Sequence, residues 1–316
     1  MSKILLFGGS GFIGDHLIRD LLAENQKVTV ADIAFRNIPE GVGFIQCDIR
    51  EAIEIKEEFD LVINLAAVHR TPGHKPYEYY ETNVLGSINI LNWCTQKKVT
   101  SVFFLSSISV YGPGNVEKNE DSQLSPHSDY GLSKAIAERI HLEWVSDESH
   151  PTRRLVICRP AVIFGKGEKG NFTRLAKLLS RGVFIYPGGK NIIKASGYVK
   201  DLCRSITYTS SLDRKITIYN FAFPSKYRIE DIVKAFGKFF KIRFQFSFLR
   251  PSHHQLIEKI GHLSKSASRA GKLMESTDIT ATKLKELGFN WKYDLDSALS
   301  DWFLDSEFDR AKENKK

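Results

Sequence analysis

The sequence is poor in cysteine and has no long apolar run. Its 316 residues include four cysteines, Cys47, Cys94, Cys158 and Cys203, which stand far apart and form no CxxC pair. Disulfide-stabilised secreted domains are usually smaller and denser in cysteine, so we interpret these thiols as reduced packing residues. No apolar run approaches the ~18–20 residues that cross a bilayer, and no signal-peptide core opens the chain. These absences predict a cytoplasmic protein that does not bind a membrane.

The chain also lacks internal repeats, low-complexity segments and any basic stripe with interleaved aromatic residues. Lys and Arg outnumber Asp and Glu by 45 to 37, a formal net charge of +8. The histidines at 253, 254 and 262 do not match a zinc-ligand spacing. We therefore expect neither a metal nor nucleic acid, and a small anionic ligand is the favoured partner of the positive charge.

Strand-like and helix-like segments alternate through the first two hundred residues. Strands are expected at 3–7, 27–31, 44–46, 60–68, 101–105 and 154–158, and helices at 12–22, 77–94 and 130–144. This alternation is typical of an α/β fold, a doubly wound parallel sheet with helices on both faces and right-handed crossovers.

The rhythm changes after Gly165, where helices begin to dominate. Helices are expected at 199–210, 229–240, 255–263, 281–287 and 295–303, with strands at 215–221 and 243–248. The sequence therefore predicts a smaller, mostly helical C-terminal lobe beside the parallel sheet.

A glycine-rich segment, GGSGFIG at residues 8–14, joins the first strand to the first helix. Glycines allow a tight turn and close approach of a ligand, and free N–H groups at a helix start bind a pyrophosphate. A glycine motif is weak evidence alone, but this one has the required strand-to-helix context. We interpret five of its residues as cofactor-binding: Gly8, Gly11, Phe12, Ile13 and Gly14.

Two acidic residues follow the second and third strands. Asp32 stands 18 residues after Gly14, where a carboxylate accepts hydrogen bonds from the adenosine ribose and repels a 2′-phosphate. This favours NAD over NADP, although Arg36 nearby would soften the preference. Asp48 either contacts the adenine amino group or caps a helix ahead of Glu51.

Tyr130 and Lys134 form a YxxxK pair, so both side chains share one face of the expected helix. A free phenol has a pKa near 10, and a lysine ammonium close by, together with the positive nicotinamide ring of a bound cofactor, would lower it towards the range of a useful base. The apolar residues Leu132, Ile136 and Ile140 form a stripe that we expect to face the core.

The same spacing occurs at Tyr186 and Lys190, but Pro187-Gly188-Gly189 between them is incompatible with a helix. We interpret this second pair as a decoy. Ser106 and Ser107 follow the strand at 101–105, and the carboxyl ends of parallel strands are where ligands bind. A hydroxyl there can hydrogen-bond a sugar oxygen and relay its proton to Tyr130.

Six motifs stand in the order seen in extended short-chain dehydrogenase/reductases. They are Gly8-x-x-Gly11-Phe12-Ile13-Gly14, Asn64-Leu65-Ala66-Ala67, Thr82-Asn83-Val84-x-Gly86, Ser106-Ser107-x-x-Val110-Tyr111-Gly112, Tyr130-x-x-x-Lys134 and Arg159-Pro160-x-x-x-x-Gly165. The chain resembles the NAD-dependent nucleotide-sugar epimerase/dehydratase family of that superfamily along about its whole length, most clearly through Gly165. The motifs are specific to the superfamily and do not select one reaction.

The resemblance implies a Rossmann domain for NAD at residues 1–165 plus 192–223. It implies a nucleotide-sugar-binding lobe at 166–191 plus 224–316. Ser107, Tyr130 and Lys134 align with the family's catalytic trio, and Tyr130 and Lys134 are expected to contact the cofactor as well. Further cofactor contacts are implied for Asp32, Asp48, Ile49, Leu65, Ala66, Ala67, Asn83 and Pro160. Substrate contacts are implied for Ser107, Ser109, Asn171, Lys194 and Arg269.

The reaction that the resemblance favours is epimerisation, at C4 of a UDP-sugar, through a transient 4-keto intermediate. An NAD(P)H-dependent 4-ketoreductase would use the same trio and is the alternative. A 4,6-dehydratase is less favoured because Ile108 and Ser109 stand where dehydratases carry an Asp-Glu pair. A non-catalytic NAD sensor would not need the trio. The helices at 77–94 and 130–144 are those through which relatives often form homodimers.

Overall fold

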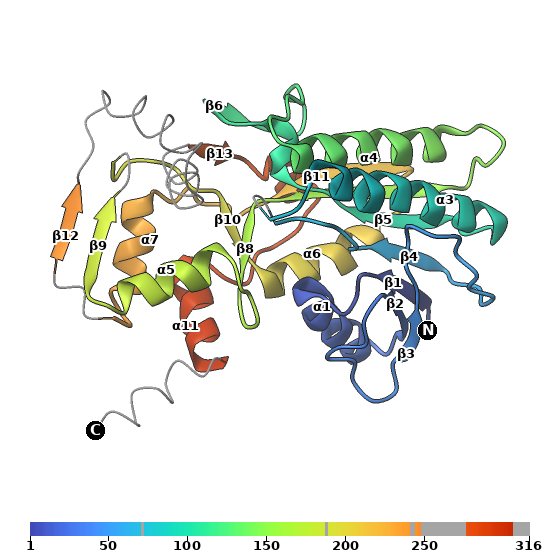
Figure 1. Cartoon of the computed structure of the whole chain (residues 1–316), viewed down its shortest axis with the longest axis horizontal. Coiled ribbons are helices and arrows are strands. Elements are labelled where there is room, and N and C mark those ends of the chain that lie inside the picture. Colours follow the sequence, from blue (N-terminus) through green and yellow to red (C-terminus); the bar gives the residue numbers. More distant parts are fainter. Residues whose placement is uncertain (71–72, 187–188, 241–243, 248–275, 306–316) are drawn as a thin grey trace.

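The computed structural model describes residues 1–70, 73–186, 189–240, 244–247 and 276–305. Seven strands form one parallel sheet in the order β11-β7-β5-β4-β1-β2-β3 (Figure 1). Their bounds are β1 Lys3–Phe7, β2 Lys27–Asp32, β3 Gly43–Gln46, β4 Leu61–Asn64, β5 Ser101–Leu105, β7 Arg154–Pro160 and β11 Ile216–Phe221. The order reverses between β1 and β4, which is the Rossmann arrangement and confirms the predicted fold class.

Helices cover both faces of this sheet (Figure 1). On one face lie α1 Phe12–Ala23 and α6 Val199–Ser210, and on the other lie α3 Gly86–Gln96 and α4 Asp129–Ser146. Strand β1 shows why both faces are apolar: Ile4 and Leu6 join the cluster under α1 and α6, while Leu5 and Phe7 join the cluster under α3 and α4. Successive side chains of a strand point to opposite faces, so a sheet covered on both sides needs a continuous apolar run.

The helix expected at 77–94 is three segments rather than one. Helix α2 Pro76–Tyr80 passes into the π-turn η1 Glu81–Leu85, and α3 follows from Gly86. Asn83 is buried in the π-turn, and a Cβ on Gly86 would lie 2.5 Å from the side chain of Ile49. Single π-turns inside helices are frequent at functional sites.

The second lobe contains α5 Asn171–Leu179, α7 Ile229–Phe236, α10 Thr282–Glu286 and α11 Leu295–Asp305. Three two-stranded parallel pairs accompany the sheet and the lobe. They are β8 Val162–Phe164 with β10 Ser196–Tyr198, β9 Val183–Tyr186 with β12 Phe244–Ser247, and β6 Gly114–Lys118 with β13 Thr277–Ile279. The prediction missed five of these strands and found β12. The helix predicted at 255–263 lies outside the described residues.

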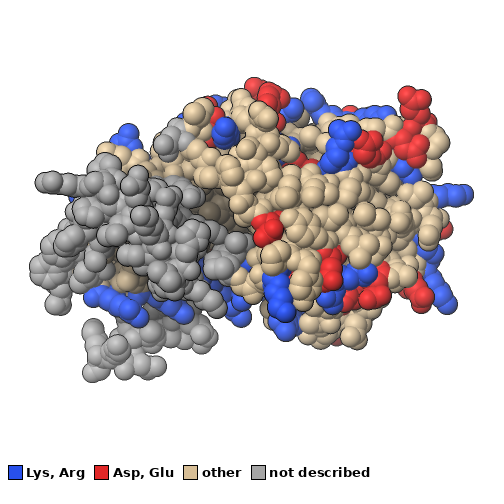
Figure 2. Space-filling model, turned by 45° about the horizontal axis from the view of Figure 1, so that its top comes forward, with Lys and Arg blue, Asp and Glu red and all other residues tan. Residues whose placement is uncertain are grey.

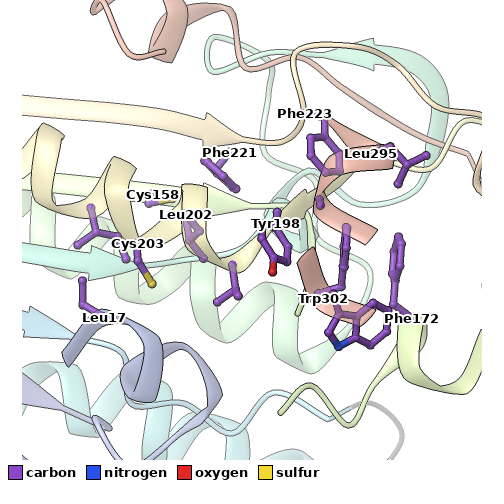
Figure 3. Packing of buried hydrophobic residues seen from close by; sticks show 14 of the residues in the cluster. Leu17, Cys158, Phe172, Tyr198, Leu202, Cys203, Phe221, Phe223, Leu295 and Trp302 are labelled. Atoms are coloured by element: carbon purple, nitrogen blue, oxygen red, sulfur yellow. The ribbon is translucent and has the colours of Figure 1, made fainter. Parts of the chain in front are cut away.

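One hydrophobic cluster joins the sheet to the lobe (Figure 3). It runs from Leu17 of α1 through Leu202 and Tyr198 to Phe172 of α5 and Trp302 of α11. The lobe is therefore packed onto the sheet by a continuous core. The four cysteines are free thiols, three of them buried and Cys47 half-buried, in line with the prediction that they are reduced packing residues.

Two residues of the predicted apolar stripe of α4 face solvent, so the predicted orientation was wrong for them, whereas the third, Ile140, is half-buried against the core. Leu132 is 42% and Ile136 is 36% exposed. The buried face carries polar residues instead, including Lys134 and Glu138. This orientation is possible because the polar groups find hydrogen-bond partners inside the protein.

Charged side chains of both signs are interspersed over the described part of the face in Figure 2. None of the helices in the described ranges is long and apolar enough to cross a membrane. Within the same ranges, no group of three or more His, Cys, Asp or Glu side chains is arranged to hold a metal ion.

Candidate active site

The candidate site lies at the carboxyl ends of the central strands. The glycine segment follows β1, Leu65 and Ala66 follow β4, and Ser106 and Ser107 follow β5. The strand order reverses between β1 and β4, and ligands of open parallel sheets bind at such a point. The predicted cofactor and catalytic residues of the sheet are therefore brought to one edge.

The glycine segment packs closely against the loop that follows β4. Gly8 has φ +77°, and a Cβ there would lie 2.6 Å from the backbone N of Ala66. A Cβ on Gly14 would lie 2.2 Å from the carbonyl oxygen of Gly9. No other residue fits either position without a shift of the backbone, so these glycines are required by the turn itself.

The start of α1 fits the pyrophosphate of a dinucleotide. The helix begins after Gly11 with no side-chain cap, and its first N–H groups, including those of Phe12 and Ile13, have no acceptor within the helix. The hydroxyl of Ser10 is buried and has no hydrogen-bond partner within the part of the chain that the structure describes. Unpaired donors at a helix start are the chemistry that binds phosphate oxygens.

Asp32 closes the same loop at the end of β2. Its carboxylate accepts hydrogen bonds from the N–H groups of Ser10, at 3.0 Å, and Ala34, at 3.2 Å. The side chain is half-buried beside the glycine segment. Asp32 thus holds the loop and leaves acceptor capacity for a ribose hydroxyl.

Asp48 and Ile49 are engaged within the protein. The Arg50 guanidinium donates to both carboxylate oxygens of Asp48, the shortest contact being 2.6 Å, and these hydrogen bonds lower the pKa of Asp48. No helix follows Asp48, so the helix-cap alternative was wrong. The Ile49 side chain is buried against Gly86, and its carbonyl oxygen accepts a hydrogen bond from the Asn89 side chain at 2.8 Å.

Ser107 and Tyr130 meet where β5 ends and α4 begins. The Ser107 hydroxyl donates to the Ser109 hydroxyl at 3.1 Å, and a hydrogen bond links Ser107 to the Tyr130 phenol. Gly131 allows this approach, because a Cβ there would lie 2.5 Å from the carbonyl oxygen of Ser109. The Lys134 Nζ donates to the carbonyl oxygen of Leu105 at 2.7 Å. The predicted trio is therefore assembled around the end of one strand.

Burial shifts the pKa values of both Tyr130 and Lys134 in the cofactor-free protein. Burial raises the pKa of Tyr130 to about 12, and the hydrogen bond with Ser107 opposes this rise. Burial also lowers the pKa of Lys134 to about 7, against the attraction of Glu138. The Lys134 Nζ is directed to the Leu105 carbonyl, with which it forms a hydrogen bond at 2.7 Å. With the protein groups alone, Tyr130 stays a neutral phenol.

Asn83 links the loop after β4 to α4. Its side-chain amide donates to the Val68 carbonyl, at 3.0 Å, and to the Ser133 hydroxyl, at 2.9 Å. Its oxygen accepts from the Val68 N–H at 2.9 Å. These contacts give Asn83 a positioning role beside the site. Ala67 lies half-buried in the loop that Asn83 holds, and Pro160 is buried at the end of β7.

A buried polar network next to the trio was not predicted. Glu138 accepts hydrogen bonds from Ser106, at 2.5 Å, and from the Arg159 guanidinium, at 2.7 Å. Arg159 also donates to the Tyr111 hydroxyl at 2.8 Å. The position of Glu138 could have been predicted from helical spacing, because Glu138 stands eight residues after Tyr130 and so lies on the same face of the helix.

Two of the three predicted substrate residues after Gly165, Asn171 and Lys194, lie within the described residues. Asn171 is exposed at the start of α5, where its oxygen accepts a hydrogen bond from Arg174 at 3.0 Å. Lys194 is half-buried, and its backbone N–H donates to the Tyr227 carbonyl at 2.9 Å. Arg269 lies outside the described residues. The roles of these three residues stay predictions.

Tyr186 and Lys190, the second pair with the YxxxK spacing, do not lie on a helix, as their sequence predicts. Tyr186 ends strand β9 and is buried, and the Lys190 Nζ lies 5.4 Å from the centre of its ring. The pair is therefore a packing contact in the lobe rather than a helical YxxxK pair.

Residues 4–222, more than two thirds of the chain, match the sequence profile of the NAD dependent epimerase/dehydratase family. This chain belongs to the NAD-dependent epimerase/dehydratase family. The match confirms the resemblance inferred from the motifs. It also confirms the class of enzyme and NAD as the cofactor, which the donors at the start of α1 fit.

Several relatives of this chain are sugar 4-epimerases. An N-acetyl-α-D-glucosaminyl-diphospho-ditrans,octacis-undecaprenol 4-epimerase of Escherichia coli O157:H7 is 28% identical over 99% of this chain and 97% of its own length. A UDP-glucose 4-epimerase of Vibrio cholerae is 31% identical over 57% of this chain and 58% of its own length. The solved UDP-Glc/GlcNAc 4-epimerase of Campylobacter jejuni has a TM-score of 0.76 at 20% identity, covering 96% of this chain and 98% of that one.

The low pKa of Lys134 predicts how its replacement affects stability. The pKa of Lys134 is about 7 in the folded protein, whereas the ordinary lysine pKa is 10.5. At pH values between these two, the unfolded chain binds more protons than the folded protein, so stability rises with pH. Lys134 therefore destabilises the fold most at low pH. Cofactor-free Lys134→Met should melt above the wild type near pH ~6, and the difference should shrink towards pH ~10. Thermal unfolding across this range measures it.

The control is Lys285→Met, which removes an exposed lysine of α10. Its difference from the wild type should stay flat over the same range. A Lys134→Met difference that is constant or grows with pH would contradict a buried lysine of low pKa.

Proposed function

We propose that this protein is an NAD-dependent 4-epimerase of a sugar attached to a diphosphate, acting through a transient 4-keto sugar. The observation that carries the proposal is the meeting of Ser107, Tyr130 and Lys134 at the end of β5, beside the glycine segment of an NAD-dependent family. Relatives with full-length or partial matches are 4-epimerases.

Each residue of the trio has a distinct task in this proposal, and that of Lys134 is to hold the cofactor through its ammonium group. Bound at the glycine segment, NAD would supply an acceptor for the C4 hydride and a donor for its return, so that no net oxidation would occur. Tyr130 takes the proton of the C4 hydroxyl and returns it, and Ser107 hydrogen-bonds the same sugar oxygen. Because the pKa of Tyr130 is about 12 with the protein groups alone, the phenol needs a positive charge beside it to act as a base.

The position of Ser109 bears on the alternatives. In the turn η2 Ile108–Tyr111, Ile108 and Ser109 offer no carboxyl group that could carry the protons of an elimination. This supports epimerisation or keto-group reduction over dehydration. A 4-ketoreductase would use the same trio and consume NAD(P)H, which a substrate assay distinguishes directly.

Replacement of Tyr130 tests the proposed base. Tyr130→Phe removes only the hydroxyl, so the fold and bound NAD should remain while the turnover number falls ~10²–10⁴-fold, the usual contribution of a positioned proton-transfer group. Steady-state kinetics and the NAD content of the purified protein measure both effects. Tyr186→Phe is the matched control and should keep its turnover. A Tyr130→Phe enzyme within a few-fold of the wild type would refute the assignment.

The proposal also concerns the group that carries the sugar, which we expect the substrate lobe to bind. The sequence motifs favour a UDP-sugar, but the similarity to the undecaprenol-diphosphate-sugar epimerase covers 97% of that protein and so extends through the lobe, whereas the UDP-glucose 4-epimerase matches over 58% of its length. This supports a polyprenyl-diphosphate sugar as a second candidate. Both candidate substrates contain a diphosphate, and we propose that Asn171 and Lys194 contact it. We also propose that residues 166–191 and 224–316 form the substrate lobe.

A direct assay separates these candidates. The purified enzyme is given UDP-glucose, UDP-N-acetylglucosamine or a short-chain polyprenyl-diphosphate N-acetylglucosamine, and the C4 configuration of the product is read by NMR. Conversion of any of them without consumption of NAD(H) supports the epimerase, and the substrate with the highest kcat/KM identifies the carrier. Turnover of a 4-keto sugar that depends on added NAD(P)H, with no epimerisation, would establish the reductase instead.

We also propose a homodimer formed by the exposed apolar faces of α3 and α4. Leu85 and Ile88 are 42% and 36% exposed beside the outward stripe of α4. Ile88 and Ile140 line a hollow of about 260 Å³ between the two helices. Exposed apolar side chains gathered on neighbouring helices are typical of interaction sites.

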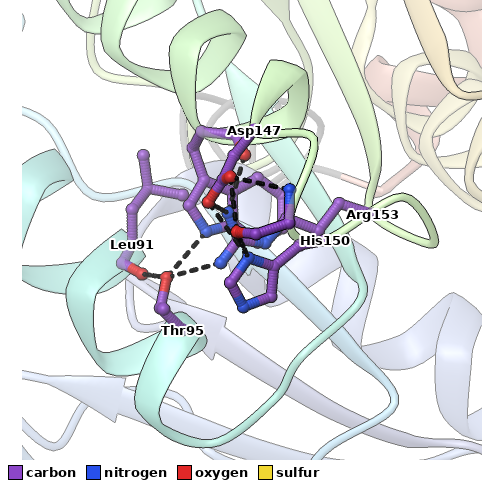
Figure 4. A network of polar contacts seen from close by, with 7 residues as sticks. Leu91, Thr95, Asp147, His150 and Arg153 are labelled. Carbon is purple, nitrogen blue, oxygen red and sulfur yellow. Dashed lines mark hydrogen bonds and ion pairs between the residues drawn. The ribbon is translucent and has the colours of Figure 1, made fainter.

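A polar network that lines the same hollow fixes the two helices to each other (Figure 4). The buried Arg153 donates to the Trp144 carbonyl, at 2.8 Å, and to the Thr95 hydroxyl, at 2.9 Å, and it pairs with Asp147. Thr95 belongs to α3 and Trp144 to α4, so the network holds the apolar face in one shape.

A charge placed on this face should separate the copies. Ile136→Glu should convert a dimer into a monomer in sedimentation velocity, because the carboxylate would be buried without a partner. Leu178→Glu is the control, since Leu178 is also 42% exposed on a helix but lies in α5 of the lobe. A wild type that is monomeric, or an Ile136→Glu variant that stays dimeric, would refute this interface.

A further inference from the structure

Glu138 is the centre of a buried ionic network that the proposed mechanism does not use. Its carboxylate is 1% exposed and accepts a hydrogen bond from the Ser106 hydroxyl at 2.5 Å. The Arg159 guanidinium donates to it from Nε, at 2.9 and 3.2 Å, and from Nη2, at 2.7 Å. A carboxylate so deeply buried stays charged only with such partners.

The network continues the arrangement of the proposed catalytic trio. Tyr130, Lys134 and Glu138 stand one helical turn apart on the same face of α4. Their partners are three successive residues of the strand end: Tyr130 meets Ser107, Lys134 meets the Leu105 carbonyl, and Glu138 meets Ser106. Glu138 is thus the third contact of one continuous junction between α4 and β5.

We propose that Glu138 is a positioning residue of this site, fixing the Ser106–Ser107 segment through its hydrogen bond and stabilising the Lys134 ammonium through its negative charge. Its meaning for catalysis rests on the proposed function. The hydrogen bond and the ion pair with Arg159 do not depend on it.

The charges around Lys134 support this role. Burial disfavours the ammonium, and Glu138 is the carboxylate that counteracts burial. The other titratable groups that interact electrostatically with Lys134 are His69, after β4, and His141, on α4. Burial lowers the pKa of both, to about 4 for His141, so neither adds a positive charge at neutral pH. Tyr130 is neutral, which leaves Glu138 as the described group of opposite charge.

A purely structural role is the competing explanation. Arg159 already neutralises Glu138, and a carboxylate fully compensated by one guanidinium would hold β7 to α4 without affecting Lys134. The two explanations differ in one quantity, the pH at which Lys134 loses its proton.

The experiment measures that pH directly in the whole protein. Lysine residues labelled with carbon-13 are titrated by NMR in cofactor-free protein, and the Lys134 signal is assigned from Lys134→Arg. Glu138→Gln keeps the size of the side chain and removes its charge, so the Lys134 midpoint should fall by about one pH unit, which is a tenfold loss of the protonated form. The alkaline limb of the kcat profile should move in the same direction.

Two further variants complete the design. Glu138→Gln with Arg159→Gln removes both buried charges, and it replaces the single variant if an unpaired Arg159 prevents folding. The fall in the Lys134 midpoint should persist in it. Glu148→Gln removes an exposed carboxylate in the turn after α4 and should leave the midpoint and the kcat profile unchanged.

A Lys134 midpoint that is unchanged in folded Glu138→Gln, or in the double variant, would overturn the proposal and leave Glu138 a structural residue. A fall in the midpoint equal to that of Glu148→Gln would overturn it too. If the midpoint falls in a protein that shows no epimerase activity, the coupling between Glu138 and Lys134 stands and the proposed function fails.

Discussion

The junction between α4 and the end of β5 determines how the rest of the site is built. Helix α4 turns Lys134 and Glu138, both 1% exposed, towards the sheet. Burying a charged group costs free energy unless the group has a partner. Here the partner of Lys134 is the Leu105 carbonyl, and the partners of Glu138 are Ser106 and Arg159. These contacts fix how α4 is rotated about its axis and how it is positioned along the sheet, and they therefore fix the position of Tyr130.

This junction also determines what α4 presents on its outer face. A helix with a polar stripe inside has its apolar stripe outside, so Leu132 and Ile136 remain on the surface. The proposed dimer would cover this stripe. Site and interface are then opposite faces of a single helix, and the Arg153 network keeps α3 in register with it.

The sequence predicted best what local chemistry controls. Gly8 and Gly14 could be identified because a turn that tight excludes side chains, and the central strands because both their faces are apolar. The orientation of α4 could not be predicted from amphipathicity, because the partners of Lys134 and Glu138 come from strands far away in the sequence. The π-turn at Asn83 depends on contacts with Val68 and Ser133, which no spacing reveals. Short strands such as β8 and β10 carry too few residues for a periodic signal.

The central claim is that Tyr130, held by the junction of α4 and β5, lies beside the nicotinamide of bound NAD. Ultraviolet difference titration of tyrosine ionisation tests it most directly, with Tyr130→Phe subtracted to isolate one phenol among the eleven tyrosines. The account predicts that Tyr130 ionises at a lower pH in protein loaded with NAD⁺ than in cofactor-free protein, where its pKa is about 12. An ionisation midpoint that is the same with and without NAD⁺ would contradict it.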